Sequence, residues 1–235
     1  MRTYLWDVPV DLFSKEEALE LASSVLSENI FKQVVTLNLE MLALALKDKE
    51  FLKILNQTFL IIPDGKWITL LLRIGKQVNT EHIPGITFVE ELLSRNEKVK
   101  IFLLGARQEV IEKAVHNLTQ VKKSTIIGYH HGYFNDDLKI ANTISQLSPD
   151  ILIVGMGSPR QEKFIFHHRD LFSFLTVGVG GSLDIWGGFV KRAPVIYRQW
   201  GLEWLYRLVR EPKRYSRILV TLFTLLKTVC FKGKP

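Results

Sequence analysis

The feature that most constrains the fold of this chain is a regular alternation of short apolar runs with helical patterns. The helical patterns are about 10–13 residues long, a length typical of the segments that join neighbouring parallel strands. Apolar runs that alternate with such helices predict a mostly parallel sheet covered by helices on both faces, a Rossmann-like α/β fold. The predicted strands span 99–104, 124–128, 150–155 and 172–178, and the predicted helices span 107–119, 136–147 and 159–168.

The first 95 residues show a less regular form of the same pattern. Ser14 and Glu17 have the spacing of a capping box, which predicts a helix to about residue 27. Thr87 and Glu90 repeat that spacing and predict a helix to about residue 95. The other elements predicted in this half are a strand at 33–37, a helix at 38–47 and a strand at 58–62.

Positive charge is concentrated near the end of the chain. The 235 residues carry a formal net charge of +7. Residues 191–235 contain 11 Lys and Arg against two acidic side chains, whereas residues 1–190 contain 20 basic and 22 acidic side chains. A chain of this length can form one α/β domain with an appendage. We therefore expect a core domain at 1–194 and a basic, membrane-associating appendage at 195–235.

The appendage is expected to contain an amphipathic helix. On a helical wheel that starts at Arg217, one polar stripe is bordered by apolar side chains. Such a helix either packs on the core or lies in a membrane interface, and an apolar face also allows self-association. The apolar run from Ile218 to Cys230 is shorter than the roughly 20 residues that cross a bilayer. The polar stripe consists of Thr221, Thr224, Lys227 and Thr228.

The sequence gives little indication of a disulfide bond or of a metal-binding site. Cys230 is the single cysteine, which excludes an internal disulfide and fits a reducing compartment. The pairs His130-His131 and His167-His168 lack further ligands at metal-binding spacing. The first residues, Met1–Asp7, lack the apolar run of a secretory signal. We expect neither a metal nor another cofactor.

Asp64 is the leading candidate for a catalytic group. It follows an apolar strand and precedes Gly65, which places it at the carboxyl edge of the predicted sheet. A partly desolvated carboxylate at such an edge is suited to act as a general base. An Asp-Gly turn that caps the next helix explains the same residues without chemistry. Thr36 and Asn38 follow the preceding strand and could line the same cleft or cap a helix.

Glycine turns follow the strands in the second half of the chain. Gly105, Gly157 and Gly180 come directly before helix starts, where backbone N–H groups can bind phosphate. The segment Ser158–Glu162 also fits an ordinary helix start with a capping box. No GxGxxG, P-loop or DxD motif occurs. If the bound phosphate group is a diphosphate that leaves during a reaction and no metal ion is present, arginines and helix termini must neutralise its charge. The arginines of the appendage could do this, but they also fit a solvated basic face.

Several segments, in order across most of the chain, resemble the WecG/TagA/CpsF glycosyltransferases, family 26 of that enzyme class. The segments Pro159–Glu162 and Gly201–Trp204 are the specific ones. The resemblance implies an inverting, metal-independent transfer of N-acetylmannosamine or a related sugar from a UDP-activated donor. The implied acceptor is a polyprenyl-diphosphate-linked saccharide, as in teichoic acid and other surface polysaccharide synthesis. The other matching segments are Thr36–Asn38, Asp64-Gly65, Pro84-Gly85, Leu103–Gly105, Gly132–Phe134, Gly178–Gly181 with Asp184, Arg192–Pro194 and the stretch through Arg217.

The resemblance also implies roles for individual residues. Asp64 matches the proposed catalytic base of the family. His82 stands where the family pattern has arginine, and Thr87 stands at a position that is often acidic. The residues expected to bind substrate are Thr36, Asn38, His82, Gln161, Glu162, Arg207, Arg214 and Arg217, and those expected to bind the nucleotide are Gly105, Gly157, Gly180 and Asp184.

The interpretation favoured by the sequence is a glycosyltransferase that is peripheral on the cytoplasmic face of a bacterial plasma membrane and binds no nucleic acid. A non-catalytic nucleotide- or lipid-binding module is the competing class. A dinucleotide oxidoreductase is disfavoured, because the glycine fingerprint and an acidic ribose partner at the expected spacing are missing. Release of UDP only in the presence of an acceptor would distinguish the transferase from both alternatives.

Overall fold

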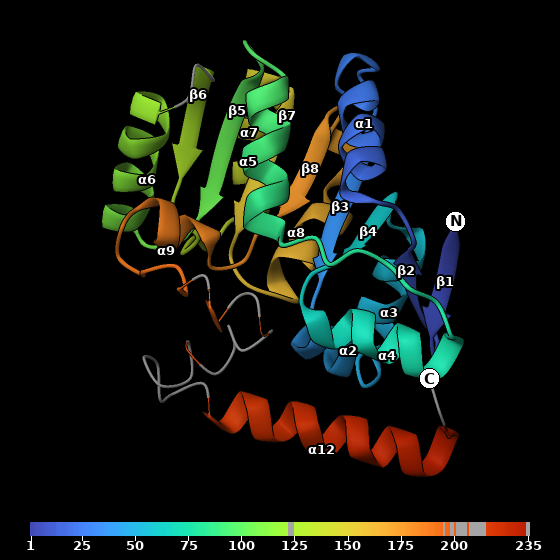
Figure 1. Cartoon of the computed structure of the whole chain (residues 1–235). Helices are drawn as coiled ribbons and strands as arrows, with labels where there is room; N and C mark the ends of the chain where they lie inside the picture. The colour runs from blue at the N-terminus through green and yellow to red at the C-terminus, as the bar shows by residue number, and fades with distance from the viewer. Residues whose placement is uncertain (122–124, 195, 198–199, 201–205, 207–214, 234–235) are drawn as a thin grey trace.

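A six-stranded parallel sheet, in the order β4-β3-β8-β7-β5-β6, forms the centre of the molecule (Figure 1). The computed structural model describes residues 1–121, 125–194, 196–197, 200, 206 and 215–233. The parallel sheet confirms the α/β class predicted from the alternation of strands and helices. Its strands are β3 (Lys32–Leu37), β4 (Leu60–Pro63), β5 (Lys100–Gly105), β6 (Thr125–His130), β7 (Ile151–Gly155) and β8 (Leu175–Gly178).

Helices cover both faces of the sheet, as expected. Alternate strand residues point to opposite faces, so Leu103 and Ile153 join one apolar cluster while Leu104 and Val154 join another. The first face is covered by α1 (Lys15–Ser24), α5 (Gly85–Arg95), α6 (Gln108–Val121) and α9 (Ser182–Trp186). The second face is covered by α2 (Leu39–Ala45), α3 (Lys49–Gln57), α7 (Asp137–Leu147) and α8 (Arg160–His167), with α4 (Lys66–Lys76) at the β4 end.

The chain leaves the carboxyl ends of β3 and β8 in opposite directions. After β3 it runs through α2 and α3 to β4 at the sheet edge. After β8 it enters α9, which packs on α6 towards the opposite edge. Ligands of open α/β sheets bind at such a divergence of neighbouring connections, outside the carboxyl ends of the strands. The fold therefore predicts a ligand-binding crevice next to the residues that follow β3, β4, β7 and β8.

Two helix starts differ from the sequence prediction. α5 begins at Gly85 after the N-cap Pro84, with no side-chain cap, so Thr87 and Glu90 do not form a capping box. α8 begins at Arg160 after the N-cap Pro159, again with no side-chain cap. The capping box at Ser14 and Glu17 is present as predicted. The pattern also did not reveal the hairpin of β1 (Arg2–Leu5) and β2 (Val8–Asp11), nor α3 and α4; the short turns η1 (Val25–Ser27) and η2 (Arg169–Leu171) complete the described elements before the tail.

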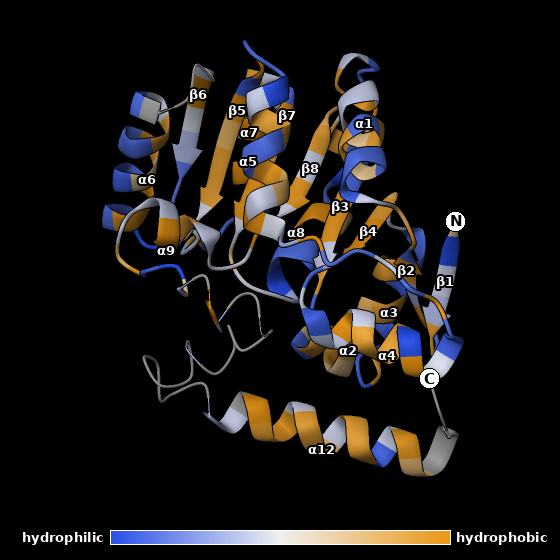
Figure 2. Ribbon diagram, viewed as in Figure 1, coloured by the Kyte–Doolittle hydropathy of each residue, from blue (hydrophilic) through white to orange (hydrophobic). Residues whose placement is uncertain are grey.

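The C-terminal helix α12 (Tyr215–Lys232) packs on the body with two threonines of its polar stripe. Thr221 and Thr224 are 7% and 4% exposed, whereas Phe223 and Leu226 are 68% and 66% exposed. The hydroxyl of Thr224 donates to the carbonyl of Val220 at 2.6 Å, so burial leaves this donor paired. Apolar residues cover much of the helix surface (Figure 2).

The position of α12 is defined at two places along its length. It lies along α2, and Leu225 packs against the apolar cluster of α2, α3 and α4. Beyond its end, the carbonyl of Gly233 accepts a hydrogen bond of 3.2 Å from the indole N–H of Trp6, between β1 and β2. Among the described helices, none has the length and apolar character needed to cross a membrane.

Candidate active site

Asp64 lies at the carboxyl end of β4, where the chain turns into α4. Its backbone N–H donates to the carbonyl of Leu37 at 2.8 Å, which ties the end of β4 to the end of β3. Gly65 adopts a φ of +109°, a conformation that favours glycine, and it is the N-cap of α4. No side chain caps this helix, so the carboxylate of Asp64 is not used for capping. The Asp64 side chain is 32% exposed and can meet a ligand.

His82 is the side chain that faces Asp64. Its Nε2 lies 3.8 Å from Oδ1 of Asp64, and its side chain is 23% exposed. The backbone nearby is fixed, because the N–H of Ile83 donates to the carbonyl of Pro63 at 2.9 Å. The structure thus brings together a partly exposed carboxylate and an imidazole at the edge of the sheet.

Thr36 joins β3 to the start of α5 and to the end of β8. Its hydroxyl donates to the carbonyl of Gly178 at 3.3 Å, and the residue is 7% exposed. Gly85 lies so close that an added Cβ would be 2.8 Å from Cγ2 of Thr36, so only glycine fits there. The neighbouring Asn38 caps α2, because its Oδ1 accepts from the N–H of Met41 at 3.0 Å.

Gln161 connects the loops that follow β7 and β8. Its Oε1 accepts hydrogen bonds from the N–H of Gly157 at 3.2 Å and from the N–H of Gly180 at 3.1 Å. Its Nε2 donates to Oε1 of Glu162 at 2.7 Å. Gly178 packs against the same amide, since an added Cβ would lie 2.5 Å from Nε2 of Gln161. The amide of Gln161 is therefore engaged within the protein and holds the two loops together.

Glu162 is completely buried behind Gln161. Its second oxygen accepts from the hydroxyl of Ser158 at 2.8 Å. Burial raises the pKa of the Glu162 carboxyl above its ordinary value, while the hydrogen bonds from Gln161 and Ser158 act in the opposite direction. This arrangement makes Glu162 a support for the side chain of Gln161.

The candidate nucleotide-binding glycines surround the same edge. Gly157 and Gly180 have φ values of +80° and +50°, and an added Cβ at either would point into open space. Their N–H groups donate to Gln161 and are not available to a ligand. The open approach to these two glycines is the space beside Cα that a side chain would otherwise occupy. Gly105, the last residue of β5, packs against the backbone of Gly155, where an added Cβ would collide with the carbonyl oxygen. Asp184 lies in the first turn of α9 and is partly exposed.

Sequence reasoning missed a polar cluster on the α5 side of the crevice. Arg192 donates to the hydroxyl of Thr87 at 2.5 Å and lies 3.7 Å from the carboxylate of Glu90. The indole N–H of Trp186 donates to Glu90 at 3.0 Å. Thr87 and Glu90 are three residues apart on one helix, so both reach Arg192 from the same side of α5. The helical spacing of these two residues was the available signal, and it was interpreted as a capping box.

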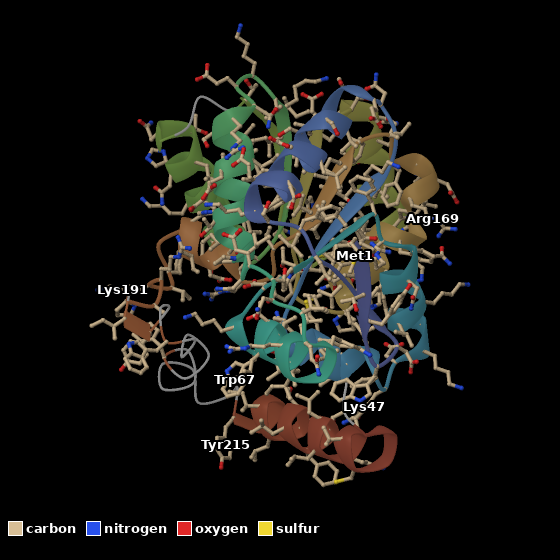
Figure 3. The ribbon with its side chains drawn as sticks, turned by 45° about the vertical axis from the view of Figure 1, so that its right-hand side comes forward. Met1, Lys47, Trp67, Arg169, Lys191 and Tyr215 are labelled. Atoms are coloured by element: carbon tan, nitrogen blue, oxygen red, sulfur yellow. The ribbon has the colours of Figure 1, made fainter. Side chains whose placement is uncertain are left out.

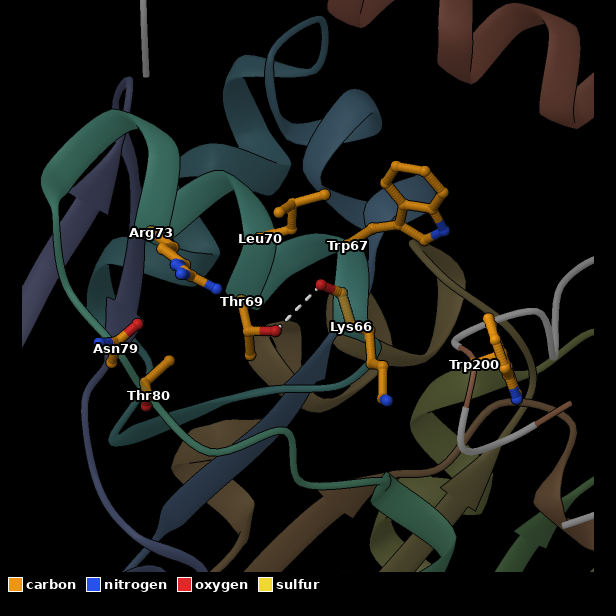
Figure 4. Close-up of a pocket in the computed structure, with 8 residues that line it drawn as sticks. All are labelled: Lys66, Trp67, Thr69, Leu70, Arg73, Asn79, Thr80 and Trp200. Atoms are coloured by element: carbon orange, nitrogen blue, oxygen red, sulfur yellow. Dashed lines mark hydrogen bonds between the residues drawn. The ribbon is translucent and has the colours of Figure 1, made fainter. Parts of the chain in front are cut away.

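An open cavity of about 420 Å³ lies along α4, which begins two residues after Asp64 (Figure 4). Trp67 points from α4 towards the side of the molecule on which Tyr215 begins α12 (Figure 3). In the sequence, the helical spacing of α4 places apolar residues on two opposite sides of the helix. Only one side can face the core, so this pattern could have indicated an exposed apolar stripe. The residues that line the cavity are Lys66, Trp67, Thr69, Leu70, Arg73, Asn79, Thr80 and Trp200.

Three expected site residues lie where the structure gives no side-chain description. Arg207 and Arg214 are outside the described residues. Arg217 lies in the first turn of α12, and its side chain is outside the described part as well. Over the described residues, no cluster of three or more His, Cys, Asp or Glu side chains could hold a metal ion.

Comparison with known proteins matches almost the entire chain to one family. Residues 3–234 match the model of the glycosyl transferase WecG/TagA/CpsF family. A Bacillus subtilis (strain 168) protein named N-acetylglucosaminyldiphosphoundecaprenol N-acetyl-beta-D-mannosaminyltransferase is 34% identical over 203 residues, 85% of this chain and 79% of that protein. A Staphylococcus aureus (strain MW2) protein with the same name is 37% identical over 196 residues, 82% of this chain and 76% of that protein.

Proposed function

The chain belongs to the WecG/TagA/CpsF family of glycosyltransferases, and from this premise we propose that it transfers N-acetylmannosamine or a related sugar from a UDP-sugar to a polyprenyl-diphosphate-linked saccharide. The names of the relatives support the sugar and the acceptor class, since both describe N-acetylmannosamine transfer to N-acetylglucosaminyl-diphospho-undecaprenol. The observation that carries the proposal in this chain is the partly exposed Asp64 beside His82, at the carboxyl edge of the sheet.

In the proposed reaction, Asp64 acts as the general base. Its carboxylate takes the proton of the acceptor hydroxyl as that oxygen attacks the anomeric carbon of the donor sugar. The bond from the anomeric carbon to the diphosphate breaks on the opposite face, and UDP leaves with the bonding electrons. The configuration at the anomeric carbon is therefore inverted. His82, 3.8 Å from the base, contributes a ring nitrogen that can orient the carboxylate or the sugar.

The sugar and nucleotide are proposed to occupy the crevice next to β3, β7 and β8. Thr36 and Asn38 flank it from the end of β3, and Gln161 shapes it by holding the loops of Gly157 and Gly180. The open space at these two glycines suits a close approach of the nucleotide to the backbone. Gly105 and Asp184 extend the nucleotide region along the same edge, and Glu162 supports Gln161 from behind.

Charge on the departing UDP is proposed to be neutralised without a metal ion. The basic residues of the appendage are suited to this task, because Arg and Lys provide charge-assisted hydrogen bonds to phosphate. The arginines proposed for it are Arg207, Arg214 and Arg217.

The domain division at 1–194 and 195–235 is proposed to separate chemistry from membrane attachment. α12 exposes Leu222, Phe223 and Leu226 while its threonines face the body, which suits insertion of the outer face into a membrane interface. The excess of basic residues in 191–235 suits anionic lipid. We propose a peripheral position on the cytoplasmic leaflet, where a lipid-linked acceptor is held. A second copy over α12 is the alternative cover for this face.

The proposed reaction is tested by measuring UDP release with a panel of UDP-sugars, including UDP-N-acetylmannosamine. The acceptor is a short-chain polyprenyl-diphosphate-N-acetylglucosamine, and each reaction is run with and without EDTA. UDP release with one donor, only when the acceptor is added, is the expected result. Donor binding without release for any acceptor would favour a non-catalytic nucleotide-binding module with the same fold, and loss of activity in EDTA would contradict metal independence.

A further inference from the structure

The outer face of α4 is divided lengthwise into a cationic half and an apolar half. α4 begins at Lys66, two residues after Asp64. Ile68 and Leu72 are buried and hold the inner side of the helix against the core. Because an α-helix turns by about 100° per residue, the outward residues fall into two adjacent rows. Lys66, Thr69 and Arg73 form the cationic half, and Trp67, Leu70 and Ile74 form the apolar half.

The apolar half is exposed to solvent, and no polar residue interrupts it. Trp67, Leu70 and Ile74 are 41%, 40% and 56% exposed, and their spacing places them in one stripe. Contiguous exposed apolar residues of this kind mark sites of interaction with lipids, ligands or proteins. Figure 4 shows Lys66 between α4 and Trp200, with Trp67 directed to the outer side of the helix.

We propose that this α4 face binds the diphosphate and the first isoprene units of the acceptor. Lys66 and Arg73 bind the diphosphate together with the polar side chains of Asn79 and Thr80, and the apolar half holds the prenyl chain. Trp200, which belongs to the appendage, also lines the cavity. The inference rests on the proposed function and adds to it a subsite for the lipid part of the acceptor.

The position of α4 relative to the base favours this occupant. The acceptor sugar must bring its hydroxyl to Asp64, and its diphosphate must then lie one sugar away. Lys66 is two residues beyond Asp64, and Arg73 lies about 10 Å further along the helix axis at about 1.5 Å per residue. The cations therefore begin beside the base and continue away from it. The apolar half runs parallel to them, and its Trp67 points to the side of α4 that faces α12 (Figure 3).

The α4 face has a cationic row beside an apolar row, and this combination favours an amphiphilic ligand over other ligands. A soluble phosphate ligand would make no apolar contact with the exposed Leu70 and Ile74. A second copy of the chain would need an apolar surface but no row of cations beside it. A prenyl diphosphate carries both features in one molecule, with the anionic group next to the apolar chain.

Binding of farnesyl diphosphate to the full chain, measured by titration calorimetry, tests the site without a sugar. Inorganic pyrophosphate and farnesol serve as half-ligands. The variants are Leu70→Ser/Ile74→Ser for the apolar half and Lys66→Gln/Arg73→Gln for the cationic half. Matched controls are Leu138→Ser, at an exposed leucine on α7, and Lys113→Gln, at an exposed lysine on α6. UDP binding and thermal unfolding are recorded for every variant.

Each double variant should weaken farnesyl diphosphate binding at least about tenfold, which is 1.4 kcal/mol. The controls should bind like the wild type, and UDP affinity should be unchanged in all variants. Wild-type affinity in both double variants, or no binding by the wild-type protein, would overturn the subsite. A dimer that dissociates in Leu70→Ser/Ile74→Ser would overturn it too, by assigning the face to a second copy. Site-specific binding without acceptor-dependent UDP release would instead refute the proposed function and leave the lipid subsite standing.

Discussion

The amide nitrogen of Gln161 donates a hydrogen bond of 2.7 Å to the carboxyl group of its neighbour Glu162, and both side chains are buried. This bond turns the amide oxygen of Gln161 towards the N–H groups of Gly157 and Gly180. A buried acid thus sets the orientation of the amide that joins the loops after β7 and β8. Both loops border the crevice, so this pair controls the shape of the candidate site from behind.

Replacement of Gln161 by methionine should destabilise the fold as well as the site. The apolar side chain has nearly the same length but cannot accept from Gly157 and Gly180. Partly buried N–H groups that lose their acceptor are expected to lower the free energy of unfolding by about 1 kcal/mol. Urea denaturation measures the change, with Gln57→Met at an exposed position as the control. An unchanged midpoint in Gln161→Met would show that the two loops do not depend on this amide.

Replacement of Glu162 by glutamine should change how stability depends on pH. The pKa of Glu162 in the folded protein is raised above its ordinary value of 4.5, mainly by burial. The folded state therefore holds this proton more tightly than the unfolded state, and the stability it contributes below pH 4.5 is lost as pH rises through the folded pKa. Glutamine keeps the neutral form at every pH.

The melting temperature of Glu162→Gln minus that of the wild type should therefore increase as pH rises from about 4.5. The difference between the two proteins is the useful quantity, because other carboxylates titrate in both. Asp48, for example, has a lowered pKa through its hydrogen bond with Lys163 and gives the opposite trend in each protein. A difference that stays constant with pH would contradict a raised pKa of Glu162 in the folded protein.

An alanine at Gly85 should destabilise the protein through a collision with Thr36. The added Cβ would lie 2.8 Å from Cγ2 of Thr36, and both residues belong to packed elements. Overpacking of this kind typically lowers the free energy of unfolding by about 1–3 kcal/mol. Thr36→Ala removes Cγ2 and Oγ1 but keeps Cβ at 2.9 Å, so the loss caused by Gly85→Ala should be reduced but not abolished in that background. Additive losses in the double variant would show that the two side chains do not compete for the same space.

Serine at Phe223 and Leu226 should weaken attachment to membranes. Both side chains are more than half exposed on α12 and point away from the body. Burial of one large apolar side chain is worth about 1.5–3 kcal/mol, so binding to anionic liposomes should fall by at least about tenfold. Sedimentation with liposomes measures the change, and Leu138→Ser/Leu147→Ser on α7 is the matched control. Equal losses in both double variants would remove α12 as the specific membrane contact.

The sequence pattern was sufficient for the parallel sheet because buried parallel strands are almost uniformly apolar. Ile151–Gly155, for example, is buried along its whole length and was easily separated from the helices around it. The first half was harder. β1, β2 and β4 have four residues each, and α4 carries apolar residues on both its buried and its exposed sides. Short strands and two-sided helices give weak periodicity.

Within the candidate site, the residues next to strand ends were predictable, but their partners were not. Asp64 and Thr36 follow from the rule that ligands bind at the carboxyl edge of such sheets. The contact of Gln161 with Gly180 joins positions 19 residues apart, and the contact of Arg192 with Thr87 joins positions 105 apart. Such long-range pairs depend on tertiary packing, which local spacing does not encode. For the same reason, the sequence did not determine whether the threonines of α12 face the body or the solvent.

The central claim is that Asp64 removes the proton from the acceptor, and the most direct test is UDP release by Asp64→Asn. The amide keeps the size of the side chain but is not a base, so acceptor-dependent turnover should fall at least about 100-fold. Melting temperature and donor affinity should stay at wild-type values, because Asp64 does not cap α4 and is partly exposed. Near-normal turnover in Asp64→Asn, with the same donor and acceptor, would contradict the assignment of the catalytic base.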